Sequence, residues 1–257
     1  MFDEEVVIIS NERVAPSLHV VEFSAPQIAS CAEPGQFVHL QIPDFGGHVL
    51  RRPFSIYTWD AEKGTLSILY QTVGSGSERL AETAPGVRTK AIGPVGHGWN
   101  PPAGTRETVL VCGGVGVAPL TMLAKQLVEA GAHVTCLVGA TAAERVVGVE
   151  KLRELGADVR VATDDGTVGH HGFCTDLLAE CPSATDYVAI CGPAPMEKVA
   201  VARVAELWGD ACTCEVSVER RMACGIGACL SCVVETVDGR KRACVDGPVF
   251  GASEVVW

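Results

Sequence analysis

Residues 109–120 read VLVCGGVGVAPL and predict a strand, a sharp turn and the start of a helix. The apolar run is typical of a buried strand, and the glycines that follow allow the chain to turn. Pro119 suits the first turn of a helix, where a missing N–H costs nothing. Such a turn places a dinucleotide pyrophosphate at a helix N-terminus, so Gly114, Gly116 and Pro119 are candidate nucleotide-binding residues. The pattern is GxGxxP in place of GxGxxG, and by itself it fits an ordinary strand-to-helix turn equally well.

The sequence around this turn alternates strand-like and helix-like runs from about residue 104 to residue 210. The strand-like runs are ETVLVCGG, AHVTCLVGA, DVRVATDDG and DYVAICGP. The helix-like runs are APLTMLAKQLVEAG, AERVVGVEKLRELGA, CTDLLAECP and PMEKVAVARVAELWG. This alternation predicts a doubly wound parallel sheet. We interpret residues 104–210 as a pyridine-nucleotide-binding α/β domain.

Two strand ends in this domain carry residues suited to a ligand, and ligands in open parallel sheets bind at the carboxyl ends of strands. One is TDDGT, which contains Asp164, and the other is CGPAPM, which contains Gly192. Cys191 is a candidate for shaping a nicotinamide site, with a buried structural cysteine as the alternative. The run GATAAER at residues 139–145 has one arginine beside a glutamate. It favours NAD over NADP, because the 2′-phosphate of NADP needs a basic partner.

Residues 1–103 contain six short β-type runs separated by turn residues, with no helical periodicity. The runs are VVIIS, SLHVVEFSA, QFVHLQIP, LRRPFSIYTW, TLSILYQTV and VRTKAIGP. Six short strands of this kind predict a small antiparallel barrel. The Pro-rich step WNPPAGT is the expected linker to the second domain.

Two motifs in the barrel indicate a flavin site when they are taken together with the nucleotide domain. Arg52 of RRPFS could clamp a pyrophosphate, and Ser55 could hydrogen-bond a flavin ring edge. The turn at residues 74–77, GSGS, offers backbone N–H groups to phosphate. Taken alone, the first motif fits an ordinary edge strand with solvated arginines, and the second fits an ordinary turn.

The C-terminal residues 211–257 contain the most specific motif. Cys224, Cys229 and Cys232 have the spacing C-x4-C-x2-C, and Cys244 follows beyond a hairpin with an Asp-Gly turn. This is the plant-type [2Fe–2S] ferredoxin spacing. The glycines between the first two cysteines let the backbone curl around an inorganic core with its N–H groups facing the sulfurs. These residues predict a [2Fe–2S] module with the four cysteines as ligands.

Structural zinc and free thiols are the alternatives for this cluster of cysteines. Structural zinc sites favour paired CxxC knuckles, to which a C-x4-C element is poorly suited. Cys212 and Cys214 lie just upstream and are interpreted as strand residues outside the site.

The composition excludes several classes of protein. The 257 residues carry a net charge of −11 at pH 7, which disfavours nucleic acid and anionic membranes as partners. The most apolar stretch, residues 109–128, is broken by glycines, a proline and a lysine, so no membrane span is expected. The start, MFDEEVVIIS, lacks the features of a signal peptide. The twelve cysteines form no disulfide pattern, and we expect a cytoplasmic protein.

Taken together, the RxxS-type strand, the GxGxxP turn and the CGPxxM strand end resemble the ferredoxin–NADP reductase superfamily. RRPFSIY, TDDGT, CGPAPM, CEVSVERRMACGIGACLSC and the closing RACVDGPVF resemble more narrowly the electron-transfer subunit of class 1B dihydroorotate dehydrogenase. The resemblance spans nearly the whole chain and is most specific in the C-terminal third. It implies an FAD barrel, a nucleotide domain and a [2Fe–2S] module in this order.

The resemblance also implies a partner and a set of flavin-binding residues. The partner is an FMN-containing catalytic subunit that oxidises dihydroorotate in pyrimidine biosynthesis, and we expect a heterotetramer with two chains of each kind. Electrons then pass from FMN through the cluster and FAD to NAD⁺. Many relatives have Thr where this chain has Ser77, which keeps the hydroxyl. The residues implied to hold FAD are Arg52, Pro53, Phe54, Ser55, Leu69, Tyr70, Gln71, Gly76 and Ser77.

Two other functions remain open from the residues alone. One is the flavin and iron–sulfur subunit of another NAD(P)-linked oxidoreductase, such as a sulfhydrogenase, a sulfite reductase or a ferredoxin-dependent transhydrogenase. The other is a regulatory iron–sulfur protein that binds nucleotide without turnover. The histidines do not indicate catalysis: His170 and His171 are interpreted as a solvated loop pair, and His97 has no partner motif.

Overall fold

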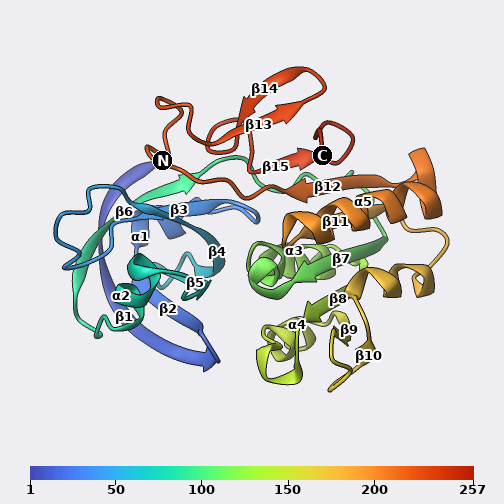
Figure 1. Ribbon diagram of the computed structural model, residues 1–257, viewed down its shortest axis with the longest axis horizontal. Helices are drawn as coiled ribbons and strands as arrows, with labels where there is room; N and C mark the ends of the chain where they lie inside the picture. The colour runs from blue at the N-terminus through green and yellow to red at the C-terminus, as the bar shows by residue number, and fades with distance from the viewer.

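A closed six-stranded antiparallel barrel forms the N-terminal part of the computed structural model, which describes residues 1–257 (Figure 1). The strand order around the barrel is β1-β2-β5-β4-β3-β6. Alternate residues point inward, and the barrel core includes Val21, Leu40 and Ile68. The predicted barrel is confirmed. Its strands are β1 (Phe2–Ala15), β2 (Leu18–Ser24), β3 (Phe37–Leu40), β4 (Arg52–Asp60), β5 (Thr65–Gln71) and β6 (Arg88–Val95).

Two short helices in this region were not predicted, α1 (Pro26–Ala29) and α2 (Ser75–Ala81). The interpretation of the GSGS run as a simple turn was wrong, because α2 begins inside it. The Ser77 hydroxyl accepts hydrogen bonds from the backbone N–H groups of Val73 and Gly74 and donates one to the Gly74 carbonyl. These bonds stabilise the first turn of a helix that is too short to show periodicity in the sequence.

A seven-stranded sheet of order β10-β9-β8-β7-β11-β12-β15 forms the second part of the molecule. All of its strands are parallel except β15. The predicted doubly wound architecture is confirmed. The strands are β7 (Glu107–Gly113), β8 (His133–Ala140), β9 (Asp158–Thr163), β10 (His170–His171), β11 (Tyr187–Cys191), β12 (Thr213–Ser217) and β15 (Val249–Gly251). The helices are α3 (Val117–Glu129), α4 (Val149–Glu154) and α5 (Ala194–Trp208), with short 3₁₀ helices at Gly114–Gly116, Ala143–Arg145, Cys174–Glu180 and Gly209–Ala211.

Two local predictions in this part were wrong, and a third was right except for the type of helix. The run 143–157 is not one helix, because Gly148 adopts a left-handed φ of 79° that separates Ala143–Arg145 from α4. The run CTDLLAECP is a 3₁₀ helix. His170 and His171 pair with β9 as a short edge strand and are not a loop.

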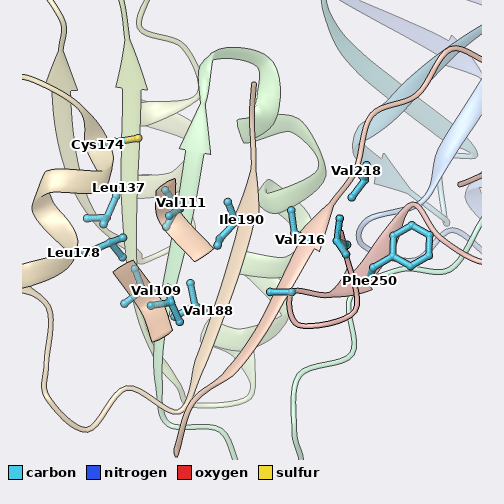
Figure 2. Close-up of a cluster of buried hydrophobic side chains, with 14 of the residues drawn as sticks. Val109, Val111, Leu137, Cys174, Leu178, Val188, Ile190, Val216, Val218 and Phe250 are labelled. Carbon is cyan, nitrogen blue, oxygen red and sulfur yellow. The ribbon is translucent and has the colours of Figure 1, made fainter. Parts of the chain in front are cut away.

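One continuous core joins the sheet to the C-terminal cysteines. Figure 2 shows Val109 and Val111 of β7 beside Val188 and Ile190 of β11, and Val216 beyond them. The same core includes Cys232, Cys244 and the barrel residue Phe37. The barrel, the sheet and the cysteine segment therefore pack against one another through shared buried side chains.

The cysteine segment is inserted between two strands of the sheet. β12 pairs with β11, and β15 returns beside β12 after the hairpin of β13 (Val233–Thr236) and β14 (Gly239–Arg242). Figure 1 shows this hairpin above the junction of the barrel and the sheet. Cys214 lies in β12 as predicted, while Cys212 precedes it. No helix in the structure is long and apolar enough to cross a membrane.

Candidate cofactor sites

The loop that carries Cys224, Cys229 and Cys232 depends on backbone conformations that favour glycine. Gly225 and Gly227 have φ values of 69° and 81°. A Cβ on Gly227 would also lie 2.5 Å from Cγ2 of Val245, so a side chain there would collide with the neighbouring segment. The two glycines of the motif are therefore needed to curl the loop, as their position in the sequence predicts.

The four cysteines are arranged as two pairs. The Cys229 side chain lies close enough to lower the pKa of Cys224, and the Cys232 side chain lies close enough to raise the pKa of Cys244. No three His, Cys, Asp or Glu side chains lie close enough together to hold a single metal ion. Two pairs of thiols fit a binuclear [2Fe–2S] core, in which four cysteines are shared between two irons. The arrangement fits one tetrahedral zinc ion less well.

The electrostatics of the loop favour a thiolate at Cys224. Desolvation acts to raise the pKa of this thiol, but hydrogen bonds from the backbone N–H groups of Ile226, Cys229 and Ala228 lower it to about 6. The Ile226 N–H lies 3.5 Å from Sγ of Cys224. Metal ligands must be deprotonated, so a loop of amide donors prepares this residue for binding.

Arg242 ties the cysteine loop to the β13–β14 hairpin. Its Nη1 donates to the Gly227 carbonyl at 3.2 Å. Its Nε and Nη2 donate to the two carboxylate oxygens of Asp246 at 3.1 and 3.3 Å. This two-point pair holds the guanidinium in one orientation beside the loop.

His39 of β3 lies beneath the same loop and was not identified from the sequence. Its side chain is 1% exposed, and a Cβ on Gly225 would lie 2.5 Å from its Nδ1. Burial, with the nearby Arg51 guanidinium, lowers the pKa of His39 to about 4, so the imidazole is neutral at neutral pH. Arg51 forms an ion pair with Asp3 at 2.9 Å.

A cavity of about 290 Å³ lies between the barrel, the sheet and the cysteine loop. Six of the predicted flavin residues line it: Pro53, Phe54, Ser55, Leu69, Tyr70 and Gln71. The wall of the cavity opposite these residues was not predicted from the sequence. The available signal was the segment VSVERRM, which lies just before the cysteine motif. That wall is formed by Ser217, Val218, Glu219, Arg220, Met222 and Pro248, and Phe37, Val73, Val115 and Ala118 complete the lining.

The other predicted flavin residues, Arg52, Gly76 and Ser77, do not line this cavity, and Arg52 lies against the first turn of α2. Its Nε is 3.1 Å from the position of a Cβ on Gly76, so only glycine leaves the guanidinium and the backbone N–H groups of this turn open to a ligand. Nη1 is held by the Leu50 carbonyl at 2.7 Å. A guanidinium facing amide donors suits a pyrophosphate. The Ser77 hydroxyl, by contrast, is used within the helix.

A larger cavity of about 730 Å³ lies at the carboxyl ends of β7, β8, β9 and β11. Gly114 and Asp164 line it, as the sequence predicts for a nucleotide site. The runs GATAAER and CGPAPM, also singled out in the sequence, contribute Thr141, Arg145, Pro195 and Met196. Further lining residues that the sequence did not single out are Leu18, Val115, Phe173, Cys174 and Thr175. Its place at the strand ends is where dinucleotides bind in open parallel sheets.

The other predicted nucleotide residues shape this cavity from behind. A Cβ on Gly116 would lie 2.1 Å from the Cys191 carbonyl oxygen, so glycine permits the close approach of the turn to β11. The Pro119 carbonyl accepts a hydrogen bond from Nε1 of Trp99 at 2.9 Å. Gly192 and Cys191 are buried and line neither cavity.

Two carboxyl groups, the buried Glu197 and the surface-exposed Glu219, have raised pKa values. Burial raises the pKa of Glu197 to about 8, and Glu197 accepts a hydrogen bond from the Gly192 N–H at 3.2 Å. Desolvation also raises the pKa of Glu219, which lines the smaller cavity. The pKa of the Cys191 thiol is raised by burial and by these two carboxyl groups, so the thiol stays protonated.

The cavities and the cysteines lie in a defined order. Gln71 and Val115 line both cavities, so the two adjoin. Met222, two residues before Cys224, lines the smaller one. A nucleotide in the larger cavity, a flavin in the smaller and a cluster on the cysteines would therefore be consecutive neighbours.

Solved structures place the chain in the fold class of the flavoprotein reductases related to ferredoxin–NADP reductase. A ferredoxin NADP⁺ reductase from Neisseria gonorrhoeae with bound FAD and NADP has a TM-score of 0.63 at 18% identity, covering 80% of this chain and 91% of that chain. Phthalate dioxygenase reductase has a TM-score of 0.64 at 18% identity, covering 91% and 87%. The NADH-dependent reduced ferredoxin-NADP oxidoreductase is more similar, with a TM-score of 0.87 at 28% identity, covering 98% and 89%.

Sequence comparison defines the family within this class. The iron–sulfur cluster binding domain of dihydroorotate dehydrogenase B matches residues 219–256. The dihydroorotate dehydrogenase B (NAD⁺) electron transfer subunit of Desulforamulus reducens is 37% identical, covering 100% of this chain and 98% of the relative. That of Shouchella clausii is 35% identical, covering 98% and 97%. The chain belongs to the family of dihydroorotate dehydrogenase B electron transfer subunits, which confirms the resemblance seen in the sequence.

Proposed function

We propose that this chain carries electrons between a dihydroorotate dehydrogenase catalytic subunit and NAD⁺ in pyrimidine biosynthesis, with FAD and a [2Fe–2S] cluster as its cofactors. The order of the larger cavity, the smaller cavity and the paired cysteines carries this proposal. When bound, a flavin exchanges hydride with nicotinamide and single electrons with an iron–sulfur centre, which neither of those two can do with the other directly.

The residues of the chain contribute binding, orientation and exclusion of water. Arg52 and the first turn of α2 would hold the flavin pyrophosphate, and Pro53–Ser55 with Leu69–Gln71 would form one wall around the ring. Gly114 and Asp164 would contact the nucleotide. Cys224, Cys229, Cys232 and Cys244 would bind the two irons. Glu219 and Ser217 close the wall between the flavin and the cluster loop.

The proposed partner contains FMN, and the complex is a heterotetramer with two chains of each kind. Exposed apolar side chains beside the cysteines support a protein partner, since Ile226 is 50% and Leu230 63% exposed. Arg220 and Met222 belong to residue types that are enriched at interfaces. A partner that covers this loop would bring its own flavin within reach of the cluster.

Co-expression with an FMN-containing dihydroorotate dehydrogenase chain is expected to yield a stable complex that reduces NAD⁺ with dihydroorotate. The isolated chain should reduce artificial acceptors with NADH and show no dihydroorotate activity. Ile226→Glu should weaken assembly without changing NADH–dye activity, because it places a charge in the interface. Ile9→Glu, at a 44% exposed position on β1, is the matched control. Dihydroorotate oxidation by this chain alone, or co-purification of a different enzyme, would exclude the assignment.

A preference for NADH over NADPH is expected, because Arg145 is the only Lys or Arg side chain that lines the larger cavity. The measurement is kcat/KM for both nucleotides with a dye acceptor. We expect kcat/KM to be about tenfold or more higher for NADH than for NADPH, because one missing hydrogen bond to a charged group changes binding by about this factor. Arg145→Ala should reduce the residual NADPH activity more than the NADH activity. A clear preference for NADPH would contradict this prediction.

A further inference from the structure

His39 occupies an unusual place for a polar residue. In the four-residue strand β3, Val38 and Leu40 point into the barrel core. Phe37 and His39 therefore point outward, where a barrel strand would ordinarily meet water. Both are buried, at 3% and 1% exposure, because the sheet and the cysteine segment cover this face of the barrel.

The ring of His39 is directed at the peptide backbone of the cysteine loop. Its Nδ1 is the nearest atom to the place that a side chain on Gly225 would occupy, at 2.5 Å. The backbones of Cys224 and Arg51 lie close enough to act on the pKa of the ring, but neither ring nitrogen has a hydrogen-bond partner of good geometry. A buried imidazole with an unpaired N–H destabilises the fold, because the group has lost its water and gained no partner.

β3 also connects the two proposed cofactor sites. His39 is paired with Pro53 of β4, and Phe37 is paired with Ser55. Phe37, Pro53 and Ser55 all line the smaller cavity. His39 is therefore a strand neighbour of the flavin wall through Pro53, and its ring lies against the cluster loop at Gly225.

We propose that His39 is a positioning residue for the iron–sulfur cluster: when the cluster is bound, the imidazole N–H of His39 donates a hydrogen bond to the Cys224 backbone carbonyl and holds the loop in its binding conformation. This inference rests on the proposed [2Fe–2S] site. The peptide that His39 contacts leads directly to Ile226, whose N–H points at Sγ of Cys224. Hydrogen bonds to the sulfurs help to set the potential of such a cluster, so a loosened loop lowers the potential.

The test replaces His39 by Phe, which keeps a ring of similar volume and removes both nitrogens. His39→Asn is the rescue variant, because its amide N–H lies where Nδ1 of the imidazole lies. His133→Phe, at an exposed histidine on the far domain, is the control. The readouts are iron content, the EPR spectrum of the reduced protein and its midpoint potential, with NADH–dye activity as a measure of the intact flavin half.

His39→Phe is expected to change the EPR spectrum and to shift the electron distribution toward the flavin about tenfold, which corresponds to about 59 mV for one electron. His39→Asn should restore both. Unchanged spectra and potential in His39→Phe, or equal changes in both variants, would show that the residue acts by packing alone and would overturn the inference. If His39→Phe loses its iron, retention of iron in His39→Asn supports the inference and its loss overturns it. Absence of iron from the unmodified protein would instead overturn the proposed function.

Discussion

Cys229→Ser is expected to abolish electron transfer to the partner while leaving NADH-driven reduction of FAD intact. Cys229 is half of one thiol pair, so its loss leaves one iron with a single cysteine ligand. Mutation of a residue that hydrogen-bonds to a metal ligand lowers metal affinity or activity by up to about 100-fold. Loss of the ligand itself should lower them further. The flavin and nucleotide cavities contain none of the four cysteines, so they should stay functional.

The measurements for Cys229→Ser are iron content, the EPR spectrum and two activities. The unmodified protein should contain about two irons per chain and show a [2Fe–2S] signal when reduced. The variant should lose the signal and the dihydroorotate-to-NAD⁺ activity of the complex, but retain NADH–dye activity. The control is Cys31→Ser, because Cys31 is another exposed cysteine and lines neither cavity. Stoichiometric zinc in the unmodified protein would disprove the cluster assignment.

Arg52→Ala is expected to release FAD and with it all NADH-dependent activity. A hydrogen bond to a charged group contributes about 1.5–3 kcal/mol, so loss of this guanidinium should weaken FAD binding by about 10- to 150-fold. Arg52→Lys should restore part of the affinity, because lysine keeps the charge but lacks the planar fork that suits a pyrophosphate.

Bound FAD per chain after gel filtration, and the Kd for added FAD, measure the effect at Arg52. Arg88→Ala is the matched control, since Arg88 is an exposed barrel arginine that is paired with Glu5 at 2.7 Å and lines neither of the two cavities. Retention of FAD at the level of the unmodified protein in Arg52→Ala would show that the pyrophosphate is held elsewhere.

Much of the architecture could be predicted because it is encoded by local patterns. Short alternating runs in residues 1–95 indicate a barrel, and strand–helix alternation after residue 104 indicates a parallel sheet. The spacing of four cysteines is enough to predict them as cluster ligands. Where local patterns were misleading, one residue decided the outcome: Gly148 divides a helix-like run, and Ser77 caps a helix that begins in an apparent turn.

The cavities depended on contacts that no local pattern reports. Ser217 and Glu219 face Ser55 only because β12 places the cysteine segment against the barrel. Cys191 was a reasonable candidate for the nicotinamide site, but the close approach of Gly116 to its carbonyl and the packing around it keep it off both cavity surfaces.

The fold class, the family and the glycine-dependent curl of the cysteine loop follow from the sequence alone, because periodicity, motif spacing and glycine positions are properties of short segments. Only the tertiary structure decided that the outward face of β3 is buried, that Phe37 borders the smaller cavity and that His39 lies under Gly225. From the sequence alone, the side chain of a histidine in a strand could equally well be exposed to water or be buried against another segment. Burial by a segment about 185 residues away in the chain is a long-range packing event, and it converts that histidine into a neighbour of the cluster loop.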